Sequence, residues 1–499
     1  MNSWFQTENN LSLKKYIEKL LNISDKYFSS NVDRSSVRAI FVPHAGIRYS
    51  GLCAASAYNS LKRQRINRVI LLCTDHYGTK QVSSSFLSNY QLNVKTDKQN
   101  INKLFLSKLA KENNKIFHQE HSFFVQLPFL QEVLPNAEII PLIIGEVDEN
   151  HMIKLTQQLR NIYDDKTVII CTSDTSHING HFSNKINNDI DNNIRKVDSI
   201  VAKYLSMGGE KNKVRNRNGL YKTTACGNYA INLFMKILDQ SPQTLYSRLT
   251  CYYTSLQREY IDISNKRKNL LDGLVKELES LSMDQSSVGY IGMIYTTTPY
   301  ILPNQNRTIE NMLTDYEKVA LLAYARKVVK YSFNRNKNKK NNNLLPIYSA
   351  VYQVHLGTFV TLKTKTGQLR GCIGTTGAKE DSLLNNVRKY SLLSAFSDSR
   401  FEPLRSEELS GVRFEISFLT EPKNITLKEY FGNQFILDRD GILLESGGYR
   451  GFFLPSVAIE FGYNKKQLLE QLCQNKIGIK KNCYLDGKLQ YVEGMHFSE

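Results

Sequence analysis

The chain lacks three kinds of sequence that would settle its class at once. It has no uninterrupted apolar run of about 18 residues, which argues against a membrane-spanning helix. Its N-terminus lacks the charged start, apolar stretch and small-residue cleavage site of a signal peptide. None of its cysteines forms a C-x-x-C pair, which argues against zinc ribbons, thioredoxin-type motifs and cysteine-rich iron–sulfur signatures. We therefore expect a cytoplasmic protein with no membrane partner, whose cysteines are reduced and buried.

Acidic residues are too few to balance the basic ones. Lys and Arg total 65 and Asp and Glu total 47, which gives a net charge of +18. Such a surplus can attract nucleic acids or acidic proteins. Most of the basic residues are scattered, however, and the densest run, at 335–340, lies in an Asn-rich stretch typical of a solvated loop. The pattern favours a solvated surface over nucleic-acid binding, which would show as steeply salt-dependent retention on DNA or RNA.

Apolar runs of strand length recur through the first half of the chain. Continuous apolar runs, rich in Ile and Val and separated by helical stretches, indicate strands buried on both faces of a largely parallel sheet. We expect a last strand of the same domain at 286–295. The sequence thus predicts an α/β domain with a largely parallel sheet flanked by helices. The four runs lie at 38–42, 68–73, 138–145 and 167–172.

A different pattern follows a stretch rich in Pro, Thr and Asn near 296–312. A helix is expected at 313–333, capped by Asp315 or Thr314. Strand patterns then dominate, with a hairpin expected at Arg439 to Gly441, so the second domain is predicted to be α+β. The predicted organisation is an N-terminal extension at 1–34, a first domain at 35–298, a linker at 299–312 and a second domain at 313–499.

Three of the predicted buried strands are each followed closely by a histidine. His44, His76 and His177 come just beyond the carboxyl ends of these strands, the edge where open α/β sheets form ligand crevices. A single histidine after a strand is more often a loop or core residue, but three in register predict a shared site. Imidazole is both the commonest transition-metal ligand and the commonest general base. Asp174, three residues before His177, is placed to orient an imidazole through its second nitrogen.

One cysteine has a context of its own. Cys226 directly precedes a helical run, so its sulfur is expected to meet the positive end of a helix dipole, which favours the thiolate, a soft metal ligand. The competing interpretation is a buried structural cysteine. His121 begins another apolar helical run. Five further histidines have no comparable context and are expected to be structural or at the surface: His118, His151, His181, His355 and His496.

Six segments of the first half occur together in a fixed order. They are PHAGIRYSG (43–51), TDHYG (74–78), HSFFVQLPFL (121–130), TSDTSHING (172–180), TACG (224–227) and SSVGYIG (286–292). Together they resemble the Memo family, a relative of the class III extradiol, LigB-type non-haem iron dioxygenases. The resemblance implies that His44, His76 and Cys226 bind a redox metal, iron or copper, with zinc also compatible with these ligands. It further implies that Asp174 and His177 line the same pocket, with His177 as the proton-transfer group.

The resemblance has one notable departure. Where many members of the family read H-S-x-E, this chain has Phe124 after His121, so the carboxylate at that position is missing. Phe124 is expected to serve helix packing. This departure supports an alternative function, a non-catalytic interaction or metal-holding module.

The second half carries its own set of motifs. They are LRGCIGTTG (369–377), FSDSRFEPL (396–404), EISFLTEP (415–422) and GYRGFFLPSVA (448–458). The set resembles the AMMECR family, which has an α+β fold and no established reaction. Within the first motif, Arg370 and Cys372 could form an anion site or a reactive thiol. We favour the structural interpretation, in which Gly371 and Gly374 shape a tight turn over Cys372.

Fusion of the two domains resembles the A and B components of the AmmeMemoRadiSam system. The resemblance implies a radical-SAM protein as partner. This chain has no C-x-x-x-C-x-x-C motif, so any radical chemistry would belong to that partner. The sequence therefore predicts a cytosolic, metal-binding, redox or oxygenase-like protein. Its substrate, a small molecule or a protein, is not identified by any motif.

Overall fold

The structure is a computed structural model in which the chain divides into two compact units. The first comprises Met1–Tyr300, Leu313–Ala320 and Leu345–Val351, and the second comprises Ile301–Met312, Leu321–Leu344 and Tyr352–Glu499. The start of helix α12 (Asp315–Ser332) thus belongs to the first unit, although the sequence placed it in the second domain. The structure describes residues 3–8, 11–28, 33–87, 94–178, 190–208, 217–261, 286–299, 309, 312–333, 346–377 and 381–499.

Two sequence expectations fall on other parts of the chain. Most of the predicted linker at 299–312 lies outside the described residues, and so does the whole Asn-rich loop at 334–343. Among the described residues, no helix combines the length and the apolar character needed to cross a bilayer.

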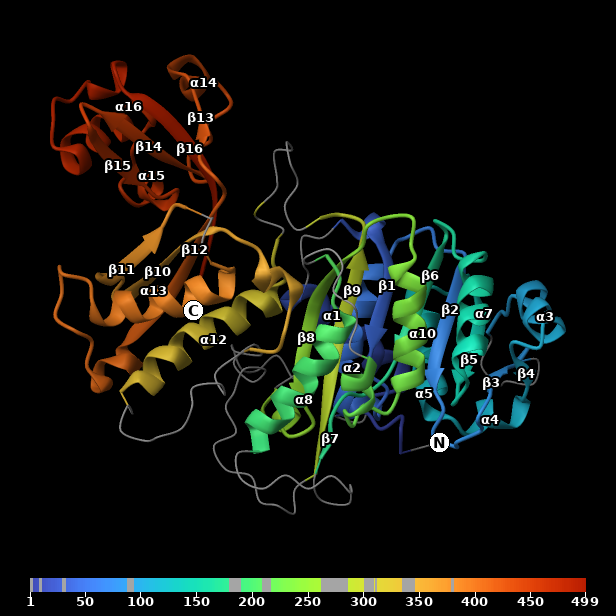
Figure 1. The fold of residues 1–499 in the computed structure, drawn as a ribbon. Helices are drawn as coiled ribbons and strands as arrows, with labels where there is room; N and C mark the ends of the chain where they lie inside the picture. The colour runs from blue at the N-terminus through green and yellow to red at the C-terminus, as the bar shows by residue number, and fades with distance from the viewer. Residues whose placement is uncertain are drawn as a thin grey trace. The chain divides into compact units, whose positions relative to one another are not determined.

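The apolar runs of the first half form the centre of the first unit's sheet. Four strands run parallel in the order β5-β2-β6-β1, and nearly all their residues are buried, as expected for strands covered on both faces. The four predicted strands are therefore confirmed (Figure 1). Their bounds are β1 (Val37–Val42), β2 (Arg68–Thr74), β5 (Glu138–Ile144) and β6 (Thr167–Thr172).

The outer strands make this sheet mixed rather than largely parallel. β9 (Ser287–Thr296), the predicted last strand, pairs antiparallel with β1, and β8 (Tyr246–Thr254) pairs antiparallel with β9. At the other side β3 (Val82–Ser84) runs antiparallel to β5. The α/β class is confirmed. The continuous apolar runs indicated the parallel centre, whereas the direction of the flanking strands depends on pairing partners far along the chain. Two short strands, β4 (Lys111–Glu112) and β7 (His177–Ile178), complete the sheet.

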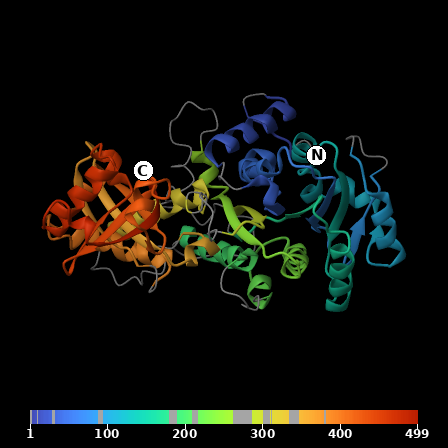
Figure 2. The ribbon, with the colours of Figure 1, turned by 90° about the horizontal axis from the view of Figure 1, so that it is seen from above.

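Helices cover both faces of the sheet, as Figure 2 shows from above. One face carries α1 (Leu13–Tyr27), α2 (Ile47–Tyr58) and α6 (Leu127–Val133), and the other carries α7 (Glu149–Arg160) and α10 (Asn228–Asp239). The other α-helices in the described part of this unit, before α12, are α3 (Lys98–Leu106), α4 (Asn114–Gln119), α5 (His121–Phe124), α8 (Ile190–Leu205) and α9 (Arg217–Tyr221).

Helix α1 is an integral part of the first unit rather than an extension of it. Ser12 caps the helix by accepting a hydrogen bond from the backbone of Lys15. Its apolar face buries Tyr16, Leu20 and Leu21 in the same core as the central strands. Removing residues 1–34 would therefore expose part of that core.

The second unit has an antiparallel sheet with the order β11-β10-β12-β16-β14-β15. The predicted α+β pattern is present, with α13 packed on β10 and β11. The strands are β10 (Gly357–Thr364), β11 (Leu369–Thr375), β12 (Val412–Leu419), β13 (Lys423–Asn424), β14 (Asp440–Ser446), β15 (Tyr449–Phe453) and β16 (Lys488–Ser498). Besides α12 from Leu321 onward, the α-helices of this unit within the described residues are α13 (Leu383–Phe396), α14 (Leu427–Phe431), α15 (Ser456–Glu460) and α16 (Lys465–Gln471).

The hairpin of this unit lies elsewhere than the sequence suggested. β14 and β15 pair antiparallel and turn at Gly447 and Gly448, both at positive φ. The prediction of a hairpin turn at Arg439 to Gly441 is therefore wrong. Asp440 instead accepts hydrogen bonds from the Arg439 guanidinium and the Ile436 backbone, which fixes the start of β14.

Two cysteines correct the expectation that all eight are reduced. Cys473 and Cys483, both buried, form a disulfide across a sequence separation of 10. The other six cysteines are free. A pair at this separation matches no short cysteine motif, so the bond could not be predicted from residue spacing.

Candidate metal centre

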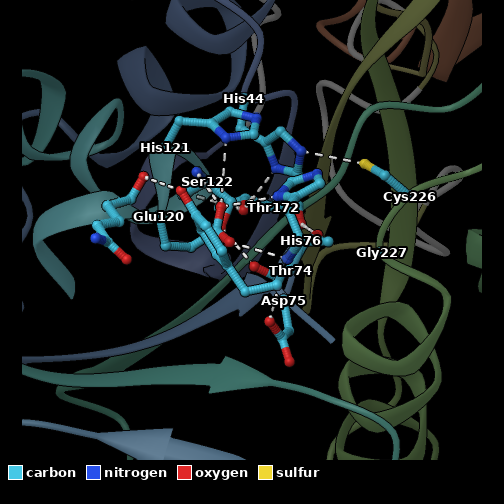
Figure 3. Close-up of polar contacts among 12 residues, drawn as sticks. His44, Thr74, Asp75, His76, Glu120, His121, Ser122, Thr172, Cys226 and Gly227 are labelled. Atoms are coloured by element: carbon cyan, nitrogen blue, oxygen red, sulfur yellow. Dashed lines mark hydrogen bonds and ion pairs between the residues drawn. The ribbon is translucent and has the colours of Figure 1, made fainter. Parts of the chain in front are cut away.

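Residues far apart in the sequence meet at the carboxyl ends of the parallel strands. His44 follows β1, His76 follows β2 and Cys226 precedes α10, and their ligand atoms all lie within 4.8 Å of one another. The Cys226 sulfur lies 3.1 Å from Nε2 of His44. Figure 3 shows the thiol facing a group of imidazole rings. The structure therefore brings together the three residues that the sequence proposed as metal ligands.

The hydrogen bonds of His44 fix which of its nitrogens carries a proton. Its Nδ1 lies 3.0 Å from the Thr172 hydroxyl, which itself donates to the carbonyl oxygen of Ser122. Because that hydroxyl proton is engaged, Nδ1 must donate and Nε2 keeps its lone pair toward Cys226. Burial, then the charge of His76, lowers the pKa of His44 well below its ordinary value, so this ring stays neutral.

His76 is held by a carboxylate that the sequence analysis did not name. Glu120, fully buried, accepts from Nδ1 of His76 at 2.8 Å and from its backbone N–H at 2.9 Å. Burial alone would lower the pKa of His76, but Cys226 and Glu120 raise it to about 10. Without an ion this imidazole is therefore protonated, and a metal would displace its Nε2 proton on binding.

His121 also lies in the cluster, which sequence reasoning left open. Its ring stacks on His76, with centroids 4.3 Å apart, and on Trp4, with centroids 3.9 Å apart. Burial, then the charge of His76, lowers the pKa of His121 to about 4. Phe124, where the family carries a carboxylate, is buried in the core and packs against Phe5, in keeping with a packing role.

Asp174 and His177 border the ligand group through backbone contacts. One carboxylate oxygen of Asp174 accepts from the backbone N–H groups of His44 and Ala45, at 2.8 and 3.3 Å. Burial raises the pKa of Asp174, and the charge of His177 opposes this. Nδ1 of His177 lies 3.0 Å from the carbonyl oxygen of Thr224, so Nδ1 carries the proton of the neutral ring. The recorded hydrogen bonds thus show Asp174 positioning the His44 segment and Thr224 positioning His177.

A buried acid beneath this segment was not named from sequence either. Asp198 on α8 accepts from the backbone N–H of Ser176 at 2.8 Å and from the hydroxyl of Tyr252 at 2.8 Å. It therefore holds the residue next to His177. The Asp198 carboxylate is linked to Ser176 across 22 positions of the chain, a contact that local spacing does not reveal.

Close backbone packing sets the position of Cys226. The backbone N–H of Gly227 donates to the Ser173 hydroxyl at 2.9 Å. A Cβ at Gly227 would lie 2.6 Å from Oγ1 of Thr74 and 2.7 Å from the Ser173 side chain, so only glycine permits this approach. The start of α10 is thereby held against the ends of β2 and β6, with the thiol toward His44.

The donor chemistry of the three residues fits a transition-metal ion. Two neutral imidazole nitrogens and one sulfur suit iron, copper or zinc and disfavour magnesium and calcium, which prefer oxygen. A second grouping, His76, Glu120 and His121, also lies within 4.8 Å. Its two rings stack at 27°, so their in-plane lone pairs run side by side instead of converging on one ion. Of the two groupings, His44, His76 and Cys226 is therefore the better candidate for a metal site.

The remaining histidines of the described residues do not join this cluster. His181 lies outside the described residues. In the part of the chain that the structure describes, His118, His151, His355 and His496 belong to no grouping that could hold a metal.

The LRGCIG segment of the second unit has a structural arrangement. Asp398 accepts the backbone N–H of Cys372 at 2.8 Å, and Arg400 donates to the Cys372 carbonyl at 3.1 Å. A Cβ at Gly371 would lie 2.1 Å from the Ser394 carbonyl on α13, so this glycine allows close helix packing. The residues lie in strand β11 rather than in the tight turn we expected.

Comparison with known proteins finds a family match in each of the two units. A family model described as Memo-like protein matches residues 3–262, and one described as AMMECR1 matches residues 322–493. Protein NEQ441 of Nanoarchaeum equitans is 35% identical over 184 residues, which cover 36% of this chain and 98% of that protein. A protein of Aquifex aeolicus is 37% identical over 137 residues, which cover 27% of this chain and 69% of that protein.

Solved structures include a similar uncharacterized protein, PH0010 from Pyrococcus horikoshii. It is 29% identical, covers 36% of this chain and 89% of its own, and has a TM-score of 0.32. The family matches account for both units, and the Memo-like match spans more than half of the residues. The chain therefore belongs to the Memo-like protein family and carries an AMMECR1 domain in the same polypeptide.

Proposed function

We propose that the first unit holds a redox-active metal ion, iron or copper, and acts as an oxygenase-like oxidoreductase on a small-molecule or protein substrate. The observation that carries the proposal is the placement of the Cys226 sulfur 3.1 Å from the unprotonated nitrogen of His44, with His76 completing the set. We favour iron because of the resemblance to extradiol dioxygenases. Zinc would suit the same three ligands but would not support redox chemistry.

The chain's own residues have separate tasks in this proposal. The ion would supply one-electron chemistry when bound. His44 and His76 each keep Nδ1 engaged in a hydrogen bond, so Nε2 is the nitrogen that each ring presents. The Nδ1 of His177 lies against the Thr224 carbonyl, so in the neutral ring Nε2 would be the nitrogen that accepts a proton from a substrate. Asp174 holds the backbone of the His44 segment in place.

Metal loading of the purified full chain tests the proposal. We expect one ion per chain by elemental analysis and, with Co²⁺ as a probe, a thiolate-to-metal absorption band that Cys226→Ser removes. Oxygen consumption by the iron or copper form, screened over small molecules, tests the redox role. Absence of stoichiometric metal binding would refute the proposal altogether.

A metal-holding module without turnover is the second candidate. The buried Phe124, at a position where many family members carry a carboxylate, favours it. The same experiment separates the two functions. Stoichiometric metal binding without oxygen consumption with any substrate tested would support the holding module. Metal-dependent oxygen consumption that is slowed by His177→Ala would support the oxidoreductase.

We further propose that this protein works in the cytoplasm with a radical-SAM protein. Support comes from the joined Memo-like and AMMECR1 domains, a fusion that resembles the A and B components of the AmmeMemoRadiSam system. Co-expression of the two proteins under anaerobic conditions, followed by affinity purification through this chain, should recover a complex. Recovery of this chain alone at high protein concentration would count against the partnership.

A further inference from the structure

We propose that Glu120 is the positioning residue of the metal centre, which locks His76 in the tautomer and orientation that present Nε2 to the ion. This inference rests on the proposed metal binding and adds a residue to it. Glu120 is fully buried and lies directly before His121, on the loop that starts α5. Neither residue spacing nor strand position points to it.

The contacts of Glu120 hold His76 at two points. Oε1 accepts from the imidazole Nδ1 and Oε2 from the backbone N–H of the same residue. The first contact fixes the ring, and the second fixes the chain that carries it. Because a carboxylate can only accept, Nδ1 keeps its proton, and Nε2 is the nitrogen that loses its proton and offers a lone pair when a metal binds.

Neighbouring bonds make the Glu120 position rigid. Oε1 also accepts from the backbone N–H of Ser122 at 3.0 Å, and the Ser122 hydroxyl donates to the Thr74 carbonyl at 2.8 Å. Thr74 ends β2, the strand that delivers His76. The carboxylate and the imidazole are therefore anchored to the same strand end, so their separation is set by the fold.

The hydrogen-bond partners of the His44 and His76 rings differ in charge. The Nδ1 partner of His44 is a neutral hydroxyl at 3.0 Å, and that of His76 is a carboxylate at 2.8 Å. A carboxylate behind an imidazole raises its basicity and strengthens its bond to a metal, and loss of such a partner typically costs about 10–100-fold in metal affinity. Removal of the Glu120 charge should therefore weaken metal binding more than removal of the Thr172 hydroxyl.

A graded series of variants separates the charge of Glu120 from its shape. Glu120→Gln keeps an acceptor without the charge, and Glu120→Ala removes both. Zn²⁺ and Co²⁺ dissociation constants, measured on the full chain by competition with a chromophoric chelator, should rise about 10–100-fold for Glu120→Gln and further for Glu120→Ala. Thr172→Val should give a smaller rise. The Co²⁺–thiolate band should persist in Glu120→Gln because Cys226 is untouched.

Glu317→Gln is the matched control. Glu317 is another fully buried carboxylate of the first unit, and it accepts the backbone N–H groups of Leu249 and Thr314 at 3.1 and 2.9 Å. It belongs to neither metal-donor grouping. Its variant should keep the unaltered metal affinity, which would show that losing a buried carboxylate is not by itself the cause of weakened binding.

The wild-type protein supplies a test that needs no variant. In the zinc-loaded chain, ¹⁵N spectra of the imidazoles should show His76 protonated at Nδ1 and metal-bound at Nε2. Metal bound at Nδ1, or equal affinities for the wild type and Glu120→Gln, would overturn the role of Glu120 while metal binding stands. If the wild type binds no metal, the failure belongs to the proposed function.

Discussion

The strand ends of the first unit and the edge strand β11 of the second both carry conspicuous motifs, but they use them in different ways. In the first unit the side chains of His44, His76 and Cys226 converge on one point. In the second, Asp398 and Arg400 bind the N–H and C=O of Cys372 and so satisfy backbone groups at the sheet edge. A motif whose side chains converge on one point is a candidate functional site. A motif whose backbone is held by hydrogen bonds from neighbouring side chains has a structural role.

The largest expected effect is on metal retention, because the comparison assumes that His44, His76 and Cys226 form a metal site in the first unit. Combined Cys226→Ser and His76→Ala should abolish metal retention, because two of three ligands disappear. The metal-free variant should remain folded but with a lowered thermal transition, because His76→Ala leaves the buried Glu120 carboxylate without its imidazole partner. Elemental analysis after gel filtration measures the first and calorimetry the second. Full retention of the ion by the double variant would contradict the assignment.

Gly371→Ala tests the structural side of the comparison. The added Cβ would lie 2.1 Å from the Ser394 carbonyl, and backbone atoms cannot yield cheaply, so we expect destabilisation of about 3 kcal/mol in urea unfolding. Gly367→Ala is the control. Gly367 has a positive φ and open space around it, so its variant should cost only about 1 kcal/mol. Equal costs at the two positions would show that close packing is not what Gly371 serves.

Asp398→Asn should remove a pH-dependent part of stability. The hydrogen bond from Arg400 lowers the pKa of Asp398 from 3.8 to about 2 in the folded protein. A group with a depressed folded pKa stabilises the protein above its unfolded pKa, and that stabilisation is lost as pH falls from about 4 toward 2. Because the Arg400 side chain is half exposed and water screens the pair, the variant should be less stable by only about 1 kcal/mol at neutral pH and should approach the wild type near pH 2. Urea unfolding at several pH values measures the gap, and a gap that stays constant with pH would refute the assignment.

Cys372→Ser should have the smallest effect. Burial raises the pKa of the Cys372 thiol, so the thiol is a poor nucleophile. The hydrogen bond from residue 372 to Asp398 comes from its backbone N–H, which serine also has. We expect a stability change below about 1 kcal/mol and unchanged metal binding. Alkylation of Cys372 in the folded chain, followed by mass spectrometry, should be slow. Rapid alkylation would instead favour the reactive-thiol interpretation.

Sequence patterns indicated the fold better than its details. The buried strands and the α+β second half follow from continuous or alternating apolar residues, which are local. Strand direction, the Gly447-Gly448 hairpin and the Cys473–Cys483 bond depend on partners far along the chain or on turn geometry. The family pattern places a carboxylate three residues after His121, whereas Glu120 directly precedes His121, so that pattern does not reveal Glu120.

The residues of the candidate site likewise divide into those that local sequence position reveals and those that only long-range contacts reveal. His44, His76 and Cys226 were recognisable because each follows a strand or begins a helix, positions that topology brings to one edge. Glu120 and Asp198 act through hydrogen bonds to residues 44 and 22 positions away, respectively. Such contacts exist only once the chain is folded.

The stacking of Trp4 on His121 gives the protein an internal optical reporter. Trp4 is the only tryptophan in the chain, and its ring lies 3.9 Å from that imidazole. Selective excitation of the indole therefore yields emission from the first unit alone, free of any contribution from the second. A paramagnetic ion next to His76 would quench this emission, so occupancy of the centre could be followed in real time and without a label.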